Sequence, residues 1–146
     1  MADNTITIVG NVTRDPELKF LNSGQQALKM SVAVNRRWQN RQSGQMEEKT
    51  SYFEVVGYGQ LAVNVAETVT KGMRVIVTGR LEQRSWETEQ GDKRSIVEIN
   101  ADDIAPSLRW AKASVERNPR AEGGPSDRPA PRAAEPSYNN FDEEPF

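Results

Sequence analysis

The chain has 146 residues, of which 19 are Lys or Arg and 21 are Asp or Glu, and it contains neither Cys nor His. This length suits one folded domain with a sizeable core, and the missing residue types exclude disulfides, thiol catalysis and the usual zinc ligands. Because the commonest general base at neutral pH is also missing, we expect no enzyme, no catalytic residue, no cofactor and no metal. No basic or long apolar stretch opens the sequence, so we expect a cytoplasmic protein without a membrane span.

The charge is divided along the chain. Residues 1–112 hold 15 basic and 14 acidic side chains, whereas residues 113–146 hold 4 basic and 7 acidic ones. Six of the 8 Pro residues fall in the last 30 positions, where aliphatic residues are scarce. We therefore predict a folded domain over 1–112 and a disordered tail over 113–146. Because the net charge of the folded domain is close to zero, any binding of a polyanion would have to be concentrated in a groove.

The body is predicted to consist mainly of strands. Apolar and polar residues alternate over 5–12, 27–35, 50–58, 74–82 and 95–101. The Asp15-Pro16 pair marks a turn after the first of these segments, and Gly79 indicates a bulge or a sharp bend in the fourth.

One segment has helical spacing instead. Leu61, Val65 and Val69 recur every fourth residue, which predicts a helix over 60–69 that stops at Lys71-Gly72. Five strands with one helix between the third and the fourth is the element order of the OB-fold, a five-stranded Greek-key barrel. The predicted fold class is therefore all-β with a single helix, followed by the disordered tail.

The third predicted strand carries large apolar groups on both faces. By alternation Tyr52 and Tyr58 share one face, whereas Phe53 lies on the other. One face can be the barrel core, so the other has to meet a ligand or another subunit. We expect Tyr52 and Tyr58 on the ligand side, and Phe53 in the core or at a subunit contact.

The segment after Pro106 has mixed periodicity. Leu108 and Trp110 alternate as in a strand, while Ala111 and Ala113 permit a helix. We expect an added strand or clasp in this segment, with Trp110 used for packing.

Two long hairpins share a design, because each begins with a Trp and turns at a Gly. Trp38 precedes Ser43-Gly44, and Trp86 precedes Gln90-Gly91. Around them lie eight basic residues that we expect to contact phosphates: Arg36, Arg37, Arg41, Lys49, Arg80, Arg84, Lys93 and Arg94. A base stacked on such a ring gains about 1 to 3 kcal/mol. The alternative is that the indoles cap the barrel ends or sit between subunits.

The last six residues form a separate signal. The segment Phe141, Asp142, Glu143, Glu144, Pro145, Phe146 combines three acids with two aromatic rings. Such a peptide can place a ring in an apolar pocket and its charges on a basic rim, so we expect a partner-binding tip. A merely solvating acidic tail is the alternative, but it has no use for exposed rings.

Together these segments resemble the bacterial single-stranded DNA-binding protein family. The resemblance covers residues from 4 to about 105 and the final six. It rests on five segments in order: TITIVGNVTRDPELKF, SVAVNRRWQN, TSYFEVVGYGQLAVNVAETVTKG, VIVTGRLEQRSWETEQGDKR and, at the end of the chain, DEEPF. The stretch after Ile104 resembles the version found in high-GC Gram-positive bacteria, where an added strand can clasp a neighbouring subunit.

The resemblance implies an OB-fold protein that forms a homotetramer and wraps single-stranded DNA. It also implies recruitment of replication, recombination and repair proteins through the tip, in the cytoplasm and at the nucleoid. Trp38, Tyr52, Tyr58 and Trp86 match the stacking aromatics of the family, and Phe53 falls where members make a subunit contact. The DEEPF ending departs from the more usual tip, which has several Asp and an aliphatic residue before Pro-Phe.

Other functions stay open at the level of sequence. The chain can be a paralogue for competence or stress, an RNA-binding or primosome-accessory OB protein, or an adaptor whose body only displays the tip. A metal-dependent OB-fold nuclease would need several converging acids. The neighbouring acids Glu47-Glu48 and Asp102-Asp103 point to opposite strand faces, which disfavours it.

Overall fold

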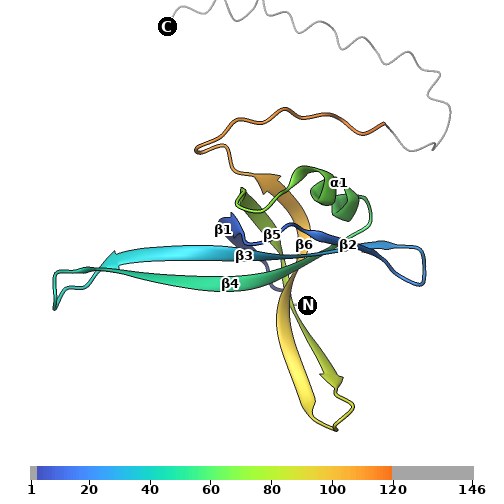
Figure 1. Cartoon of the computed structure of the whole chain (residues 1–146), viewed down its shortest axis with the longest axis horizontal. Coiled ribbons are helices and arrows are strands. Elements are labelled where there is room, and N and C mark those ends of the chain that lie inside the picture. Colours follow the sequence, from blue (N-terminus) through green and yellow to red (C-terminus); the bar gives the residue numbers. More distant parts are fainter. Residues whose placement is uncertain (1–2, 120–146) are drawn as a thin grey trace, which may run out of the picture. The chain divides into compact units, whose positions relative to one another are not determined.

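The computed structural model describes residues 3–119, and the tip at 141–146 lies outside them. The elements in chain order are β1 (Ile6–Val12), β2 (Glu17–Phe20), β3 (Gln26–Gln39), β4 (Met46–Tyr58), α1 (Gln60–Thr68), β5 (Arg74–Glu87) and β6 (Lys93–Pro106) (Figure 1). The chain divides into two units, Met1–Ala113 and Ser114–Phe146, and the first contains all of these elements.

The strands close into a barrel. The sheet order is β1-β5-β6-β4-β3-β2, and an additional pairing of β1 with β3 joins its ends, with β2 left as a short edge strand. All pairings are antiparallel except the β4–β6 pairing. With one helix between β4 and β5, this is the five-stranded OB-fold barrel that the alternation pattern predicts.

The barrel interior is aliphatic. In β1 and in the first half of β5 every second residue is buried, as expected where one face of a sheet packs on the core. The largest fully buried side chains are Leu28, Met30, Ile99, Val12, Val32, Val55, Val75 and Val77. Helix α1 adds Ala62 and Val65 to this core and packs against β2, β3, β4 and β6.

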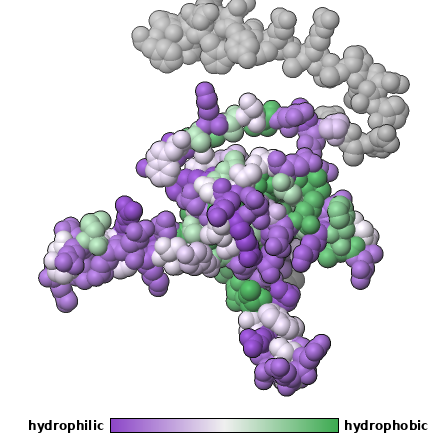
Figure 2. All heavy atoms as spheres, in the orientation of Figure 1, coloured by the Kyte–Doolittle hydropathy of each residue, from purple (hydrophilic) through white to green (hydrophobic). Residues whose placement is uncertain are grey.

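Both predicted hairpins are longer than the alternation indicated. Strands β3 and β4 stay in register from Ala27↔Tyr58 to Gln39↔Met46, and β5 and β6 continue to Glu87↔Lys93. In Figure 1 the two hairpins leave the barrel in different directions, and Figure 2 shows their ends as mostly hydrophilic. The turns use Gly44 and Gly91 at positive φ, 69° and 85°, as predicted.

Three details differ from the sequence-based expectation. The turn at Asp15-Pro16 leads into an unpredicted strand, β2, which pairs with the start of β3. The helix ends at Thr68, one residue early, because Val69 is already extended. Residues 107–119 form no helix or strand, so the added strand expected after Pro106 does not form within this chain, and the clasp stays a prediction; the Ser107 N–H donates to the Arg74 carbonyl at 2.9 Å.

Two glycines mark the places where backbones approach most closely. A Cβ on Gly10 would lie 2.3 Å from the Ala33 carbonyl oxygen, where β1 meets β3. A Cβ on Gly79 would lie 2.1 Å from the Asn100 oxygen, next to the register shift at Thr78/Gly79. The bulge expected at Gly79 is confirmed, and barrel closure depends on both glycines lacking a side chain.

A methyl group at Gly79 should therefore weaken the barrel. We expect Gly79→Ala to lower the free energy of unfolding by about 1 to 3 kcal/mol, since the clash is with backbone atoms. Urea unfolding followed by circular dichroism measures this change. Gly57→Ala is the matched control, because its Cβ would meet only Leu61 and Leu28 at 3.8 and 4.0 Å. Equal stability of the two variants would contradict the clash.

Candidate nucleic-acid interface

The four aromatic rings predicted to stack bases are all accessible to solvent. Their exposed fractions are 37% for Trp38, 69% for Tyr52, 43% for Tyr58 and 40% for Trp86. None belongs to the aliphatic core. An exposed ring on a rigid strand is an amphipathic platform that costs little entropy to use.

Register places three of these rings on one surface. On β4, Val55 points inward, so Tyr52 and Tyr58 point outward together with Val56. Val56 pairs with Asn100 on β6, so Asn100 also points outward. Arg94 is six residues before Asn100 on β6 and shares its face, and Arg94 pairs with Trp86 on β5. Trp86 therefore lies on the same side as the two tyrosines. We call this surface the outer face: the outward side of β3, β4, β6 and β5, with Lys29, Tyr52, Val56, Tyr58, Arg80, Arg84, Trp86, Arg94 and Glu98.

Trp38 lies on the other side of its hairpin. Along β3 it lies on the same face as Met30 and Val32, which point into the core. Trp38 itself is in the part of the strand that extends past the core, so its ring is exposed. The Arg36 guanidinium stands 5.7 Å from the centre of the Trp38 ring. This side of the β3–β4 hairpin therefore forms a second aromatic and cationic surface, distinct from the outer face.

The Trp38 side carries an uncompensated pair of like charges. Arg36 is directly opposite Lys49 in the antiparallel register, and no ion pair within residues 3–119 involves either of them. Like charges directly opposite each other are destabilising in a sheet. A bound anion between the two strands would relieve this repulsion.

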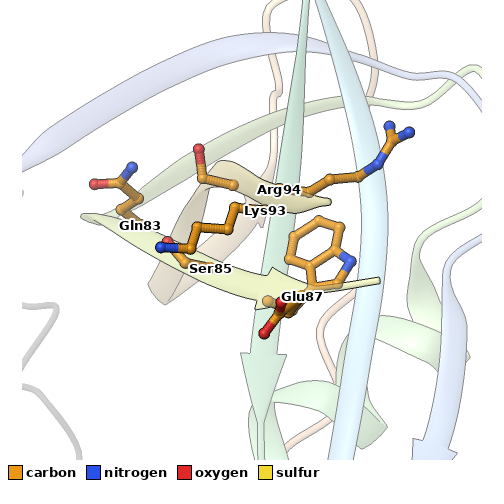
Figure 3. Close-up of a pocket in the computed structure, with 7 residues that line it drawn as sticks. Gln83, Ser85, Glu87, Lys93 and Arg94 are labelled. Atoms are coloured by element: carbon orange, nitrogen blue, oxygen red, sulfur yellow. The ribbon is translucent and has the colours of Figure 1, made fainter. Parts of the chain in front are cut away.

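The end of the β5–β6 hairpin divides its cations between two sides. Trp86 pairs across the strands with Arg94, and Lys93 pairs with Glu87. Figure 3 shows the Lys93 and Arg94 side chains pointing in opposite directions. A shallow hollow of about 420 Å³ is lined by residues of both strands here. Both sides of this hairpin can thus present a positive charge to a phosphate.

Three of the predicted phosphate ligands already face a carboxylate on the outer face. Arg37 lies 3.7 Å from Glu48, and Arg80 lies 4.0 Å from Glu82, both between exposed groups. The third, Arg84, donates its Nε–H to Glu98 at 3.1 Å and also stands 5.0 Å from the centre of the Trp86 ring. Arg84 therefore orients the indole as well as offering charge.

Glu98 is the most enclosed charged group of the outer face, with 7% of its surface exposed. Together with Arg84 it lines a pocket of about 300 Å³ beside Tyr58. We call it the Tyr58 pocket; its lining consists of Glu17, Lys19, Leu21, Ala27, Leu28, Lys29, Val56, Tyr58, Arg84 and Glu98. It combines an aromatic wall, aliphatic groups and charges of both signs.

The sequence-based prediction includes only Tyr58 and Arg84 of the residues that line this pocket. Lys19 and Leu21 belong to the unpredicted β2 and its turn, and Lys29 lies on the outward side of β3. Glu98 interrupts the apolar run Ile96-Val97-Glu98-Ile99, and that interruption is a signal that could have identified it.

Two further aromatic residues have other surroundings. Phe53 is partly buried against the core, in agreement with one of its two expected places, and its subunit contact stays a prediction. Trp110 is 74% exposed, with the guanidinium groups of Arg74 and Arg109 at 4.6 and 5.2 Å from its ring centre. Within this chain it contacts cations instead of packing into an apolar core.

No cluster of three or more Asp, Glu, His or Cys side chains within residues 3–119 could hold a metal ion. None of the helical structure in the same range is long and apolar enough to cross a membrane.

Comparison with known proteins agrees with this geometry. Residues 3–107 match the model of the single-strand binding protein family. The single-stranded DNA-binding protein of Corynebacterium glutamicum is 50% identical over 121 residues, which are 82% of this chain and 54% of that protein. The single-stranded DNA-binding protein of Mycobacterium tuberculosis H37Rv is 47% identical over 131 residues, 88% of this chain and 80% of that protein. The chain thus spans about half the length of the first relative and most of the second.

A solved structure adds the fold. The chain described as "Plasmodium falciparum SSB complex with ssDNA" aligns with a TM-score of 0.67 and 30% identity, over 73% of this chain and 97% of that one. The sequence match, the barrel topology and this structural match point to one family. The chain belongs to the single-strand binding protein family.

Proposed function

We propose that this protein binds single-stranded DNA with little sequence specificity and without catalysis. The observation that carries the proposal is the row of exposed rings, Tyr52, Tyr58 and Trp86, on one face beside arginines. Bases stack on the rings, and Arg and Lys side chains contact the phosphates. The names of the similar proteins support the same ligand.

The strand would use both sides of the β3–β4 hairpin. On the outer face it contacts Tyr52, Tyr58 and Trp86, and around the hairpin it reaches Trp38 with its opposed cations, Arg36 and Lys49. Arg41 in the turn and Lys93 and Arg94 at the other hairpin extend the cationic path. An OB domain of this kind occupies roughly 4 to 16 nucleotides.

The proposal extends to assembly and partners. The protein would act as a homotetramer in the cytoplasm, at the nucleoid, and protect unpaired strands during replication, recombination and repair. The tip, Phe141–Phe146, would recruit the proteins of these processes by its rings and acids. Family membership supports all three parts.

One open edge supports self-association. Strand β1 pairs with β3 only at Asn11 and Val12, so within residues 3–119 the stretch from Ile6 to Val9 has no paired strand on that side. Next to it, Val9 and Ile76 are cross-strand neighbours on the outward side of β1 and β5, and Ile76 is exposed. Unpaired strand edges and exposed apolar groups favour contact with another copy.

Removing one indole tests the stacking. We expect Trp86→Ala to weaken binding of an oligo(dT) by about 1 to 3 kcal/mol, the contribution of one stacked base. Quenching of tryptophan fluorescence during titration measures both the stacking and the affinity. Val97→Ala is the control, since Val97 is 56% exposed on the opposite side of the same hairpin. Unchanged wild-type emission at saturating oligo(dT) would contradict the stacking.

Deleting Glu143–Phe146 separates strand binding from partner binding. The truncated chain should keep its affinity for oligo(dT), because every predicted stacking residue lies within the barrel and its hairpins. It should lose its ability to retain replication and repair proteins in a pull-down from a bacterial extract. Scrambling the same residues without changing their composition controls for charge. Retention by the truncated chain would assign partner binding to the folded domain instead.

Light scattering tests the assembly. The full chain should have about four times its own mass of 16.4 kDa in solution. Ile76→Glu should reduce this mass, because it places a charge in the proposed apolar contact. Val97→Glu adds the same charge on the projecting hairpin and should leave the mass unchanged. A monomeric wild-type chain would rule out the tetramer.

A further inference from the structure

The Tyr58 pocket contains a hydrogen-bond acceptor that stacking alone does not use. Glu98 has a side chain that is 9% exposed, and its Oε1 accepts the 3.1 Å bond from the Arg84 Nε–H. No further hydrogen bond to its other oxygen, Oε2, is seen within residues 3–119; this oxygen is not one of the buried atoms that lack a partner, so solvent reaches it from the pocket that Glu98 lines. A donor on a ligand that enters the pocket can replace this solvent and form a charge-assisted bond.

The surroundings of Glu98 fit a base as the source of that donor. The ring of Tyr58 forms one wall, while Val56 and Leu21 supply apolar surface. At about 300 Å³ the pocket is at the small end of ligand sites. Lys19 and Lys29 also line it and are placed to contact the phosphates on either side of an inserted base.

The edge groups of the bases decide which base fits. Cytosine carries an amino group, N4, and carboxylate side chains accept hydrogen bonds from it. Thymine and uracil present a carbonyl oxygen, O4, at the same position, which a carboxylate repels. The ring that stacks on Tyr58 has the same size in all three pyrimidines, so only the edge differs.

We propose that the Tyr58 pocket is a base-selective subsite in which Glu98 accepts a hydrogen bond from the amino group of cytosine. The inference rests on the proposed binding of single-stranded DNA and adds a local preference to it. Arg84 has a positioning role, because its bond to Oε1 fixes the carboxylate and leaves Oε2 for the base. The remaining subsites stack bases without reading their edges.

Glu98→Gln tests the subsite at constant size. The Gln oxygen can keep the bond from Arg84, which turns the amide N–H₂ toward the pocket and makes it a donor. Affinities for oligo(dC) and oligo(dU) of equal length are compared by fluorescence titration at pH 8. The wild-type chain should favour dC, and Glu98→Gln should shift the dC/dU affinity ratio toward dU by roughly tenfold, the effect of one charge-assisted hydrogen bond.

Glu82→Gln is the matched control. Glu82 lies directly opposite Glu98 across β5–β6 and carries the same charge, but it does not line the pocket and its partners are Arg80 and Asn100. Both variants lose one negative charge, which favours every strand to a similar extent, so the comparison uses the dC/dU affinity ratio within each variant. Only Glu98→Gln should change the dC/dU ratio. An equal ratio in the wild type and both variants would overturn the subsite.

A modified strand tests the same bond without changing the protein. Oligomers of N4,N4-dimethyl-deoxycytidine have no N4–H donor, and the wild-type chain should bind them no better than oligo(dU). Binding equal to that of oligo(dC) would overturn the inference even if Glu98→Gln failed to fold. If the wild-type chain bound none of these oligomers, the proposed DNA binding itself would fail, which distinguishes the two outcomes.

Discussion

Close approach of two pairs of backbones determines the rest of this structure. Gly10 lets β1 lie against the Ala33 carbonyl, and Gly79 lets β5 cross the Asn100 carbonyl at the bulge. These two contacts close the barrel, and closure decides which residues of each strand point inward. The aliphatic residues fill the interior, so the alternate residues, including Tyr52, Tyr58 and Trp86, are held outward on a rigid sheet.

The balance of charge on the outward surface is equally specific. Arg37, Arg80 and Arg84 each have a carboxylate within 4.0 Å, whereas Arg36 and Lys49 oppose each other without one. Within residues 3–119 four arginines form ion pairs with carboxylates, while Arg36 and Lys49 place two positive charges without an ion pair beside Trp38. Aromatic stacking can carry more of the binding energy in such a protein than long-range attraction does.

Much of the fold could be predicted from periodicity. The five barrel strands and α1 follow from alternation and from the spacing of Leu61, Val65 and Val69, because burial on one face enforces both patterns. Strand β2 was missed, since it has four residues and only Leu18 packs on the core. The hairpin ends were underestimated for a related reason: beyond the core both faces are solvated, and alternation disappears.

The residues of the candidate interface could be named from the sequence, but their arrangement on the faces of the sheet could not. Exposed Trp beside Arg is a local pattern, so Trp38 and Trp86 could be identified from the sequence. Their separation onto two sides depends on register, and the pairing of Arg84 with Glu98 joins residues that are 14 positions apart. Such contacts require the three-dimensional sheet. The tip and the tail lie outside residues 3–119, so their roles rest on composition and resemblance.

The paired arginines have a consequence for how a strand would leave the protein. A phosphate that reaches Arg37 or Arg80 displaces a carboxylate that is already in place, and on departure the carboxylate returns. Each such contact exchanges one anion for another and frees fewer counterions than a bare cation would. The paired arginines should therefore contribute less to the salt dependence of binding than Arg36 and Lys49 do, and when a strand leaves, the returning carboxylates neutralise them again.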